Sequence, residues 1–238
     1  TRKTRTWAEI SLGALRHNVS EMQRALPDGC GLLGVVKADA YGHGASEIAA
    51  ALHECGCRYL AVACPQEALA LRQAGETMPI LILGAVDAAF ASDMAANDIT
   101  LSVECAEKGR ALSAALRPGE QLKIHLKLDT GMGRLGFRAQ DESSLRAAAA
   151  LAQLPNLEAE GVFTHFSVSD TPGEEDYTAA QLALFLSAVE MLEAMIGRRF
   201  PLRHCANSGA VLSWREKGAA LDLVRPGLLT YGVYPDSE

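Results

Sequence analysis

Residues 32–63, LLGVVKADAYGHGASEIAAALHECGCRYLAVA, contain one unit of a pattern that recurs along the chain. An almost continuously apolar run (Leu32–Val36) precedes polar residues, apolar residues at helical spacing (Ala45–Cys55) and a second apolar run (Tyr59–Ala63). Apolar runs without polar alternation are typical of parallel strands that are covered on both faces. The unit is therefore interpreted as strand, loop, helix and strand.

Eight such units over 238 residues predict an α/β fold of the (β/α)8 TIM-barrel type. A doubly wound open sheet is disfavoured, because no G-x-G-x-x-G turn follows the first strand. The predicted strands are Leu32–Val36, Tyr59–Ala63, Ile80–Leu83, Thr100–Val103, Leu122–Leu128, Leu157–Phe163, Leu202–Cys205 and Leu221–Val224. The predicted helices between them are Ala45–Cys55, Gln66–Ala74, Ala88–Asn97, Glu104–Leu116, Glu142–Leu154 and Ala179–Ile196, with a weaker helical start after Asn207.

The sequence also predicts the extent of the barrel and the apolar faces of its first helix and its last long helix. Residues 1–11 are interpreted as an N-terminal extension whose Thr6–Ile10 segment alternates like a strand, and residues 12–235 as the barrel. Ser11 is expected to cap a first helix that buries Leu12, Leu15, Val19, Met22 and Leu26. In the last long helix, a single buried stripe is expected from Leu182, Phe185, Leu186, Val189, Leu192 and Ile196.

Composition excludes several classes of partner. The net charge is −7, from 22 basic and 29 acidic residues without a basic cluster, so nucleic-acid binding is not expected. No apolar run approaches the ~20 residues that span a bilayer, and the longest, Met78–Ala91, is interrupted. No targeting signal is found, so the cytoplasm is the default location and the six cysteines are expected to be reduced thiols.

Polar side chains follow five of the predicted strands. Lys37, the segment Asp129–Arg134, Thr164-His165, Ala206–Ser208 and Arg225–Gly227 all occupy such positions. In a TIM barrel the working residues lie at the carboxyl ends of the strands, so these side chains are expected to share one rim.

The chemistry of that rim suggests a phosphorylated aldehyde. Lys37 could form a Schiff base if burial makes its amine nucleophilic, or it could simply extend from a strand end to solvent. Asn207 and Ser208 could begin a phosphate site after the seventh strand, or could only cap a helix. Taken together, Lys37, Arg225 and Ser208 could meet the requirements of pyridoxal 5′-phosphate for a lysine, a partner for the ring nitrogen and phosphate donors.

Five motifs resemble those of the alanine racemases, in the same order and over nearly the whole chain. The motifs are VKADAYGHG (36–44), LDTGMGRLG (128–136), THF (164–166), ANS (206–208) and RPGLLTYG (225–232). The resemblance implies the pyridoxal-phosphate barrel of an enzyme that interconverts L- and D-alanine by two-base α-proton transfer through a cofactor aldimine. It also implies D-alanine synthesis for peptidoglycan precursors and a homodimer of the full-length protein.

The resemblance assigns catalytic roles to four residues. Lys37 matches the lysine that holds the cofactor and acts as the base on the D-side, and Arg225 matches the arginine at the pyridine nitrogen. His165 matches a histidine that links Arg225 to the second base. Arg134 matches an arginine near the phenolic oxygen of the cofactor and the substrate carboxylate.

The resemblance also implies a cofactor-binding set and two further positions. The cofactor-binding set is Lys37, Tyr41, Leu83, Asn207, Ser208, Arg225, Gly227 and Leu228. Lys127 matches a lysine that is carbamylated in some relatives, and Asp170 matches an acidic residue where substrate enters, although it could be an ordinary loop acid. No metal site is implied.

The family continues into a C-terminal β domain that supplies the opposing tyrosine base, and none of the five tyrosines here matches that base. The chain is therefore interpreted as the barrel part of such an enzyme, with weak or no racemisation by residues 1–238 alone. Three other functions are considered: a serine or broad-specificity amino-acid racemase, a non-catalytic pyridoxal-phosphate-binding barrel and a metal-dependent hydrolase. The last has His43, His125 and Glu67 available but no metal-binding spacing. His125 and His204 are interpreted as core or surface residues.

Overall fold

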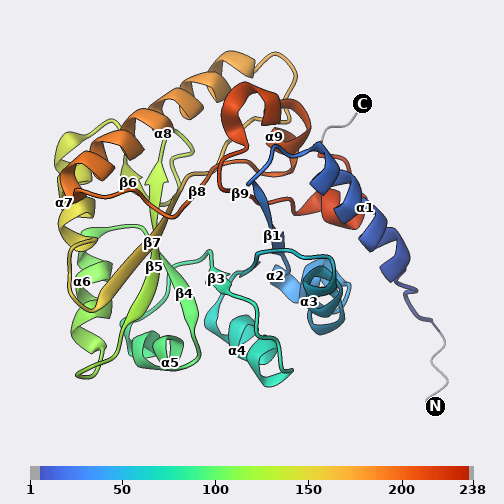
Figure 1. Cartoon of the computed structure of the whole chain (residues 1–238), viewed down its shortest axis with the longest axis horizontal. Coiled ribbons are helices and arrows are strands. Elements are labelled where there is room, and N and C mark those ends of the chain that lie inside the picture. Colours follow the sequence, from blue (N-terminus) through green and yellow to red (C-terminus); the bar gives the residue numbers. More distant parts are fainter. Residues whose placement is uncertain (1–5, 236–238) are drawn as a thin grey trace.

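A computed structural model describes residues 6–235 as a barrel of parallel strands surrounded by helices (Figure 1). The hydrogen-bonded order of the strands is β8-β7-β5-β4-β3-β2-β1-β9, and the two-residue strand β6 (Phe137–Arg138) pairs with β5 outside this path. The eight barrel strands are β1 (Gly31–Val35), β2 (Tyr59–Val62), β3 (Ile80–Ile82), β4 (Ile99–Val103), β5 (Leu122–Asp129), β7 (Leu157–Phe163), β8 (Leu202–His204) and β9 (Leu223–Val224). Each coincides with a predicted strand to within two residues at either end.

The last two strands close the ring through contacts at their flanks. The amide of Asp222 donates to the carbonyl of Arg203 at 3.1 Å, and the Arg225 amide donates to the Ala206 carbonyl at 2.9 Å. The side chain of Asp222 also accepts from the amide and the guanidinium of Arg203, both at 2.8 Å. The barrel is therefore nearly closed, and the predicted fold class is confirmed.

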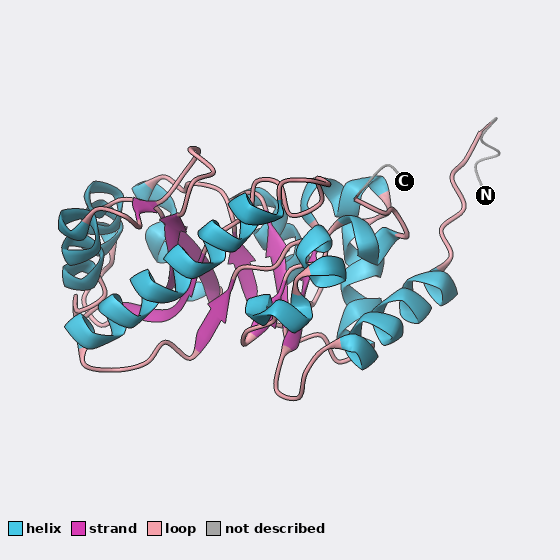
Figure 2. Ribbon diagram, turned by 90° about the horizontal axis from the view of Figure 1, so that it is seen from above, coloured by secondary structure: helices cyan, strands magenta, loops and turns pink. Residues whose placement is uncertain are grey.

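Helices and short turns of helix connect the strands on the outside of the barrel (Figure 2). The α-helices are α1 (Leu12–Ala25), α2 (Lys37–Gly42), α3 (Ala45–Glu54), α4 (Pro65–Gln73), α5 (Ala91–Ala96), α6 (Ala106–Ala115), α7 (Glu142–Leu151), α8 (Glu175–Ile196) and α9 (Ser208–Ser213). The short helical turns are η1 (Ala88–Phe90), η2 (Arg215–Ala219) and η3 (Leu228–Tyr231). As expected, the Ser11 hydroxyl caps α1 by accepting from the Ala14 amide at 3.2 Å.

The apolar core has two parts. The larger part lies between the strands and the helices, which explains why the parallel strands are apolar on both faces. The smaller part fills one side of the barrel interior with Leu33, Val35, Tyr59, Ala61, Leu81 and Leu223. The rest of the interior is polar, since the buried side chains of Thr100, Ser102, His125, Lys127 and His204 come from β4, β5 and β8.

The expected N-terminal strand is not formed within the described part of the chain. Residues 6–10 form no strand, and the Trp7 side chain is 76% exposed. A strand needs a hydrogen-bonding partner, and the barrel strands described here pair with one another. Residues 1–5 of the expected extension lie outside the described part of the chain.

The long helix α8 corrects two further expectations. Leu182, Phe185, Val189 and Leu192 are buried, but Leu186 is 42% exposed and does not belong to the buried stripe. The helix turns by about 100° per residue, so Leu186 lies beside the buried face rather than on it. By length and composition, α8 is also the one helix within residues 6–235 apolar enough to cross a membrane, but it packs along α7 as an outer helix of the barrel.

Candidate functional site

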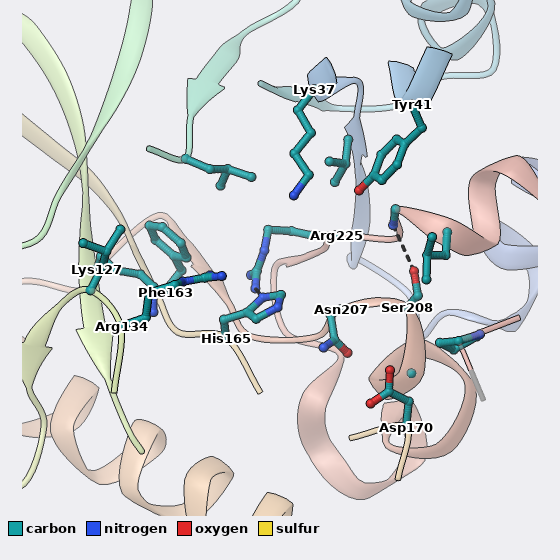
Figure 3. Close-up of a pocket in the computed structure, with 17 residues that line it drawn as sticks. Lys37, Tyr41, Lys127, Arg134, Phe163, His165, Asp170, Asn207, Ser208 and Arg225 are labelled. Carbon is teal, nitrogen blue, oxygen red and sulfur yellow. Dashed lines mark hydrogen bonds between the residues drawn. The ribbon is translucent and has the colours of Figure 1, made fainter. Parts of the chain in front are cut away.

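A cavity of about 280 Å³ opens at the carboxyl ends of the strands, where a TIM barrel carries its active site (Figure 3). All twelve residues that the sequence nominated contribute to its wall. They are Lys37, Tyr41, Leu83, Lys127, Arg134, His165, Asp170, Asn207, Ser208, Arg225, Gly227 and Leu228. In Figure 3 the amine of Lys37 points toward the Arg225 side chain, whose guanidinium lies beside the ring of His165.

Lys37 and Tyr41 are placed by an unusual turn. Residues 38–41 have φ values between 52° and 56°, so α2 contains four consecutive residues in the left-handed conformation. That conformation costs roughly 1–2 kcal/mol for each residue with a Cβ. The turn reverses the chain so that Lys37 and Tyr41 face the same cavity, with the lysine Nζ 5.8 Å from the centre of the tyrosine ring.

Glu67 holds this turn against the neighbouring strand. Its carboxylate accepts from the amide of Ala38 at 2.8 Å and from the amide of Ala63, just after β2, at 2.7 Å. A carboxylate that accepts two backbone N–H groups forms strong, charge-assisted hydrogen bonds. Glu67 therefore stabilises the strained backbone that follows Lys37.

The corner of the cavity beside the Tyr41 hydroxyl is built from small residues and backbone amides. The Gly227 amide donates to the Ser208 hydroxyl at 3.0 Å, the contact dashed in Figure 3, and the Leu229 amide donates to the same oxygen at 3.4 Å. A Cβ on Gly227 would lie 2.6 Å from the Tyr41 hydroxyl oxygen, so only glycine permits this approach. Hydroxyls and amides thus converge as a phosphate site requires.

Asn207 has a structural role at the same corner. Its side-chain oxygen accepts from the amide of Ala210 at 3.0 Å and so caps α9, and it also accepts from the Ser169 hydroxyl at 2.7 Å. The helix-cap interpretation of Asn207 is therefore the one that the contacts show. Only the amides of Ser208 and Gly209, which precede Ala210 in the first turn of α9, remain available to an anion.

Arg225 is buried and hydrogen-bonded on several sides. Its Nη1 lies 2.8 Å from Nδ1 of His204, and its Nη2 donates to the carbonyl of Thr164 at 2.7 Å and to that of Cys205 at 3.2 Å. Nη2 also lies 3.3 Å from Nδ1 of His165. Burial lowers the pKa of Arg225 to about 10, so the guanidinium still carries its proton at neutral pH.

Burial and the cluster of cations shift two neighbouring side chains toward their neutral forms. Burial, together with Arg225 and Lys127, lowers the pKa of His165 to about 3. Burial and Arg225 lower the pKa of Lys127 to about 7, although Asp129 opposes the shift. The amine of Lys127 donates to the Leu128 carbonyl at 2.8 Å.

Arg134 and Asp170 reach the cavity from loops. The loop that carries Arg134 is fixed by Asp129, whose carboxylate accepts from the amides of Gly131 and Gly133 at 3.0–3.1 Å. Asp170 lies against α9, where a Cβ on Gly209 would come within 2.7 Å of it. The two side chains lie in different parts of the wall in Figure 3.

Sequence reasoning missed several wall residues and one important contact. Val35, Leu135, Phe163, Gly209 and Pro235 also line the cavity. Phe163 lies two residues before His165 in the chain, so the alternation of a strand could have indicated it. His204, expected only in the core or on the surface, is a buried hydrogen-bond partner of Arg225 and stacks on Phe163 with ring centres 4.8 Å apart.

The side chains considered for a metal-dependent hydrolase are engaged elsewhere. His43 contacts the carbonyls of Ala40 and Tyr41, Glu67 accepts the two amides described above, and His125 contacts His204. These separate contacts leave no shared coordination centre for His43, Glu67 and His125.

Comparisons with known proteins agree with this geometry. Residues 10–235 match the family model described as "Alanine racemase, N-terminal domain". An alanine racemase of Desulforamulus reducens is 41% identical over 233 residues, which cover 98% of this chain and 62% of that protein. An alanine racemase of Methanococcus maripaludis is 41% identical over 230 residues, which cover 96% and 60% respectively.

Solved structures show the same fold. Alanine racemase of Clostridium difficile 630 in complex with cycloserine has a TM-score of 0.94 and 36% identity, and the match covers this whole chain and 64% of that one. Alanine racemase of Bacillus anthracis with bound L-Ala-P has a TM-score of 0.93 and 33% identity, covering 100% and 60%. The chain thus spans about three-fifths of the length of these relatives. It belongs to the family of alanine racemase N-terminal domains.

Proposed function

We propose that this chain is the pyridoxal-phosphate-binding barrel of an alanine racemase that interconverts L- and D-alanine. The observation that carries the proposal is the convergence of Lys37, the Ser208–Gly227 corner and Arg225 on one cavity. The relatives with bound cycloserine and L-Ala-P support an amino-acid-sized ligand at this site.

The residues present fit pyridoxal 5′-phosphate. Ser208, the amides at the start of α9 and the hydroxyl of Tyr41 would hold the phosphate, and the glycine at 227 leaves the space that this requires. Arg225 would face the pyridine nitrogen, and Lys37 would bond to the aldehyde carbon. When bound, the cofactor supplies an electrophilic carbon and an electron sink for the α-carbon of an amino acid.

Each side chain of the site has a separate task in this scheme. Arg225 donates a hydrogen bond but keeps its proton, because its pKa of about 10 remains above that of a pyridinium partner. Lys37 accepts and returns the α-proton on one face of the substrate. Arg134 is the cation available to a substrate carboxylate, and neutral His165 accepts from Arg225.

Racemisation also needs a base on the opposite face of the α-carbon. We propose that this base belongs to the part of the relatives that residues 1–238 do not span, and that the full-length protein works as a homodimer. Residues 1–238 alone would then exchange the α-proton of D-alanine without inverting it.

Isotope exchange tests this proposal. The protein with pyridoxal phosphate would be incubated with D-alanine, L-alanine, D-serine or L-serine in D₂O, and deuterium content and enantiomer ratio would be measured together. We expect deuterium in D-alanine with retained configuration, loss of exchange in Lys37→Ala, and no change in Lys217→Ala, whose lysine lies over Trp214 at the surface. Absence of exchange from every amino acid would support a non-catalytic cofactor carrier, and faster exchange of serine would support a serine racemase.

We further propose that Lys127 carries a carbamate, as the family resemblance suggests. A pKa of about 7 leaves a large fraction of the amine unprotonated at neutral pH, which is the form that adds to carbon dioxide. The product is an anion that could pair with Arg134, whereas an ammonium would repel it.

A further inference from the structure

A chain of hydrogen-bonded side chains crosses the polar half of the barrel interior, from the cavity to the other end. Nη1 of Arg225 lies 2.8 Å from Nδ1 of His204, and Nε2 of His204 lies 2.8 Å from Nδ1 of His125. Nε2 of His125 lies 3.3 Å from Oε1 of Glu160. We call Arg225, His204, His125 and Glu160 the interior relay.

The donors in this relay can be arranged in only one direction. A guanidinium has no acceptor, so Nδ1 of His204 must accept from Arg225 and its proton must reside on Nε2. That Nε2–H then donates to Nδ1 of His125, whose own Nε2–H donates to Glu160. Both imidazoles are therefore neutral Nε2–H tautomers, in agreement with the lowered pKa that burial gives each of them.

Glu160 closes the relay with a negative charge. Its carboxylate also accepts from the hydroxyl of Tyr59 and, at 3.0 Å, from that of Thr100. Burial raises the pKa of Glu160, but the hydrogen bonds from His125 and Tyr59 outweigh it and keep the carboxyl ionised. A buried cation is costly unless it is compensated, and Arg225 is 4% exposed.

The backbone is adapted to this arrangement. The pairing of β5 with β7 changes register between Ile124 and His125, so that Glu160 is the extra residue of a β-bulge. Bulges next to active sites commonly redirect a side chain. The bulge brings Gly161 beside His125, where a Cβ would lie 2.6 Å from the imidazole ring, so glycine is needed for the ring to fit.

We propose that Glu160 is a positioning residue that fixes the orientation and the positive charge of Arg225 through His125 and His204. The existence of the relay follows from the contacts described above. Its effect on the reaction rests on the function proposed above. The other titratable groups nearby are Lys127 and His165 on the cavity side, and Asp98, Lys123 and Glu158 at the far end. The Asp98 and Lys123 side chains pair with each other at 2.7 Å.

Imidazole ¹⁵N NMR of the protein without added cofactor tests the relay itself. We expect both His125 and His204 to be Nε2–H tautomers in the unmodified protein. Glu160→Leu removes the acceptor and should change the tautomer or the shifts of both rings. Glu160→Gln retains an acceptor without its charge, and should move the His125 Nε2–H resonance upfield even if the leucine variant does not fold. Glu158→Gln, on the same strand, should change neither ring. Nδ1–H tautomers, or rings unaffected in both Glu160 variants, would overturn the proposal.

Deuterium exchange into D-alanine with pyridoxal phosphate tests the effect on chemistry. We expect Glu160→Gln to lower kcat roughly tenfold with little change in KM, the size typical of residues that orient a functional group from behind. Glu160→Asp should recover part of the loss, and Glu158→Gln should exchange at the normal rate. An unchanged rate in Glu160→Gln would overturn the positioning role. If the unmodified protein exchanges nothing, the proposed function fails while the NMR result still decides the relay.

Discussion

Close contacts at single residues determine the shape of the phosphate corner. Gly227 touches Tyr41 so closely that one added carbon would overlap the tyrosine hydroxyl, while its amide contacts Ser208. These three residues therefore cannot move independently.

Replacing Gly227 should weaken cofactor binding. In Gly227→Ala the new methyl group displaces the Tyr41 ring, and we expect the Kd for pyridoxal phosphate to rise about tenfold or more, equivalent to about 1.4 kcal/mol. An absorbance titration measures this change. Gly13→Ala is the matched control, because a Cβ there meets nothing closer than 3.8 Å. Equal affinities in the two variants would contradict the proposed phosphate corner.

We expect Lys127 to react with carbon dioxide, as proposed above. Its lowered pKa predicts a ¹³C carbamate resonance when the protein is exchanged into ¹³C-bicarbonate buffer, and the signal should disappear in Lys127→Ala. Lys123→Ala should retain the signal, because Lys123 pairs with Asp98 and its pKa is raised. A resonance that survives in Lys127→Ala would assign the carbamate to another amine.

The backbone of α2 is held in place by a side chain from another element. Its left-handed backbone is held by the carboxylate of Glu67, which bridges the residue after Lys37 and the end of β2. The geometry of Lys37, the proposed cofactor lysine, therefore depends on a side chain from α4.

Glu67→Gln should test this support. An amide can accept only one of the two N–H groups well and presents its own NH₂ to the other, so we expect a loss of about 1.5–3 kcal/mol in the free energy of unfolding. Urea denaturation measures it, with exposed Gln66→Ala as the control. A loss no larger than that of the control would show that the turn holds without Glu67.

The sequence predicted the barrel elements well because parallel strands and outer helices have strong periodic signals. It did not predict the left-handed turn, since alanine disfavours that conformation and a single Asp39 does not indicate four consecutive left-handed residues. Thr6–Ile10 alternated like a strand but had no partner among the described strands. Side chains such as Lys37, His165 and Arg225 reached the cavity because position after a strand fixes the rim. Tyr41, Leu83, Lys127 and Asp170 were nominated by the family resemblance alone, and the contact of His204 with Arg225 depends on packing across the barrel.

At the scale of the whole molecule, buried neutral histidines link stability to pH. The pKa values of His125, His165 and His204 are all lowered, chiefly by burial, so the unfolded chain binds more protons than the folded one below pH ~6.5. The contribution of these three histidines to stability is fully present above that pH and is lost as the pH falls below it.

We expect the free energy of unfolding to decrease between pH 6.5 and 5, with about 1.4 kcal/mol per pH unit from His165, whose folded-state pKa is about 3, and with further contributions of the same sign from His125 and His204. Urea midpoints at several pH values measure the slope. His165→Asn should reduce it, whereas His17→Asn, at an exposed position, should not. A flat profile over this range would show that the buried rings are protonated in the folded state.

The turn after Lys37 has one more consequence, which concerns chirality. A left-handed helical turn is the mirror image of a right-handed one, so the crowding of Cβ against the backbone at Ala38 and Ala40 arises only for L-residues. Introducing D-alanine at either position by chemical ligation would place its methyl group on the uncrowded side and relieve about 1–2 kcal/mol per site. The segment that presents the proposed cofactor lysine thus has the backbone geometry that D-residues, rather than L-residues, prefer within a polypeptide.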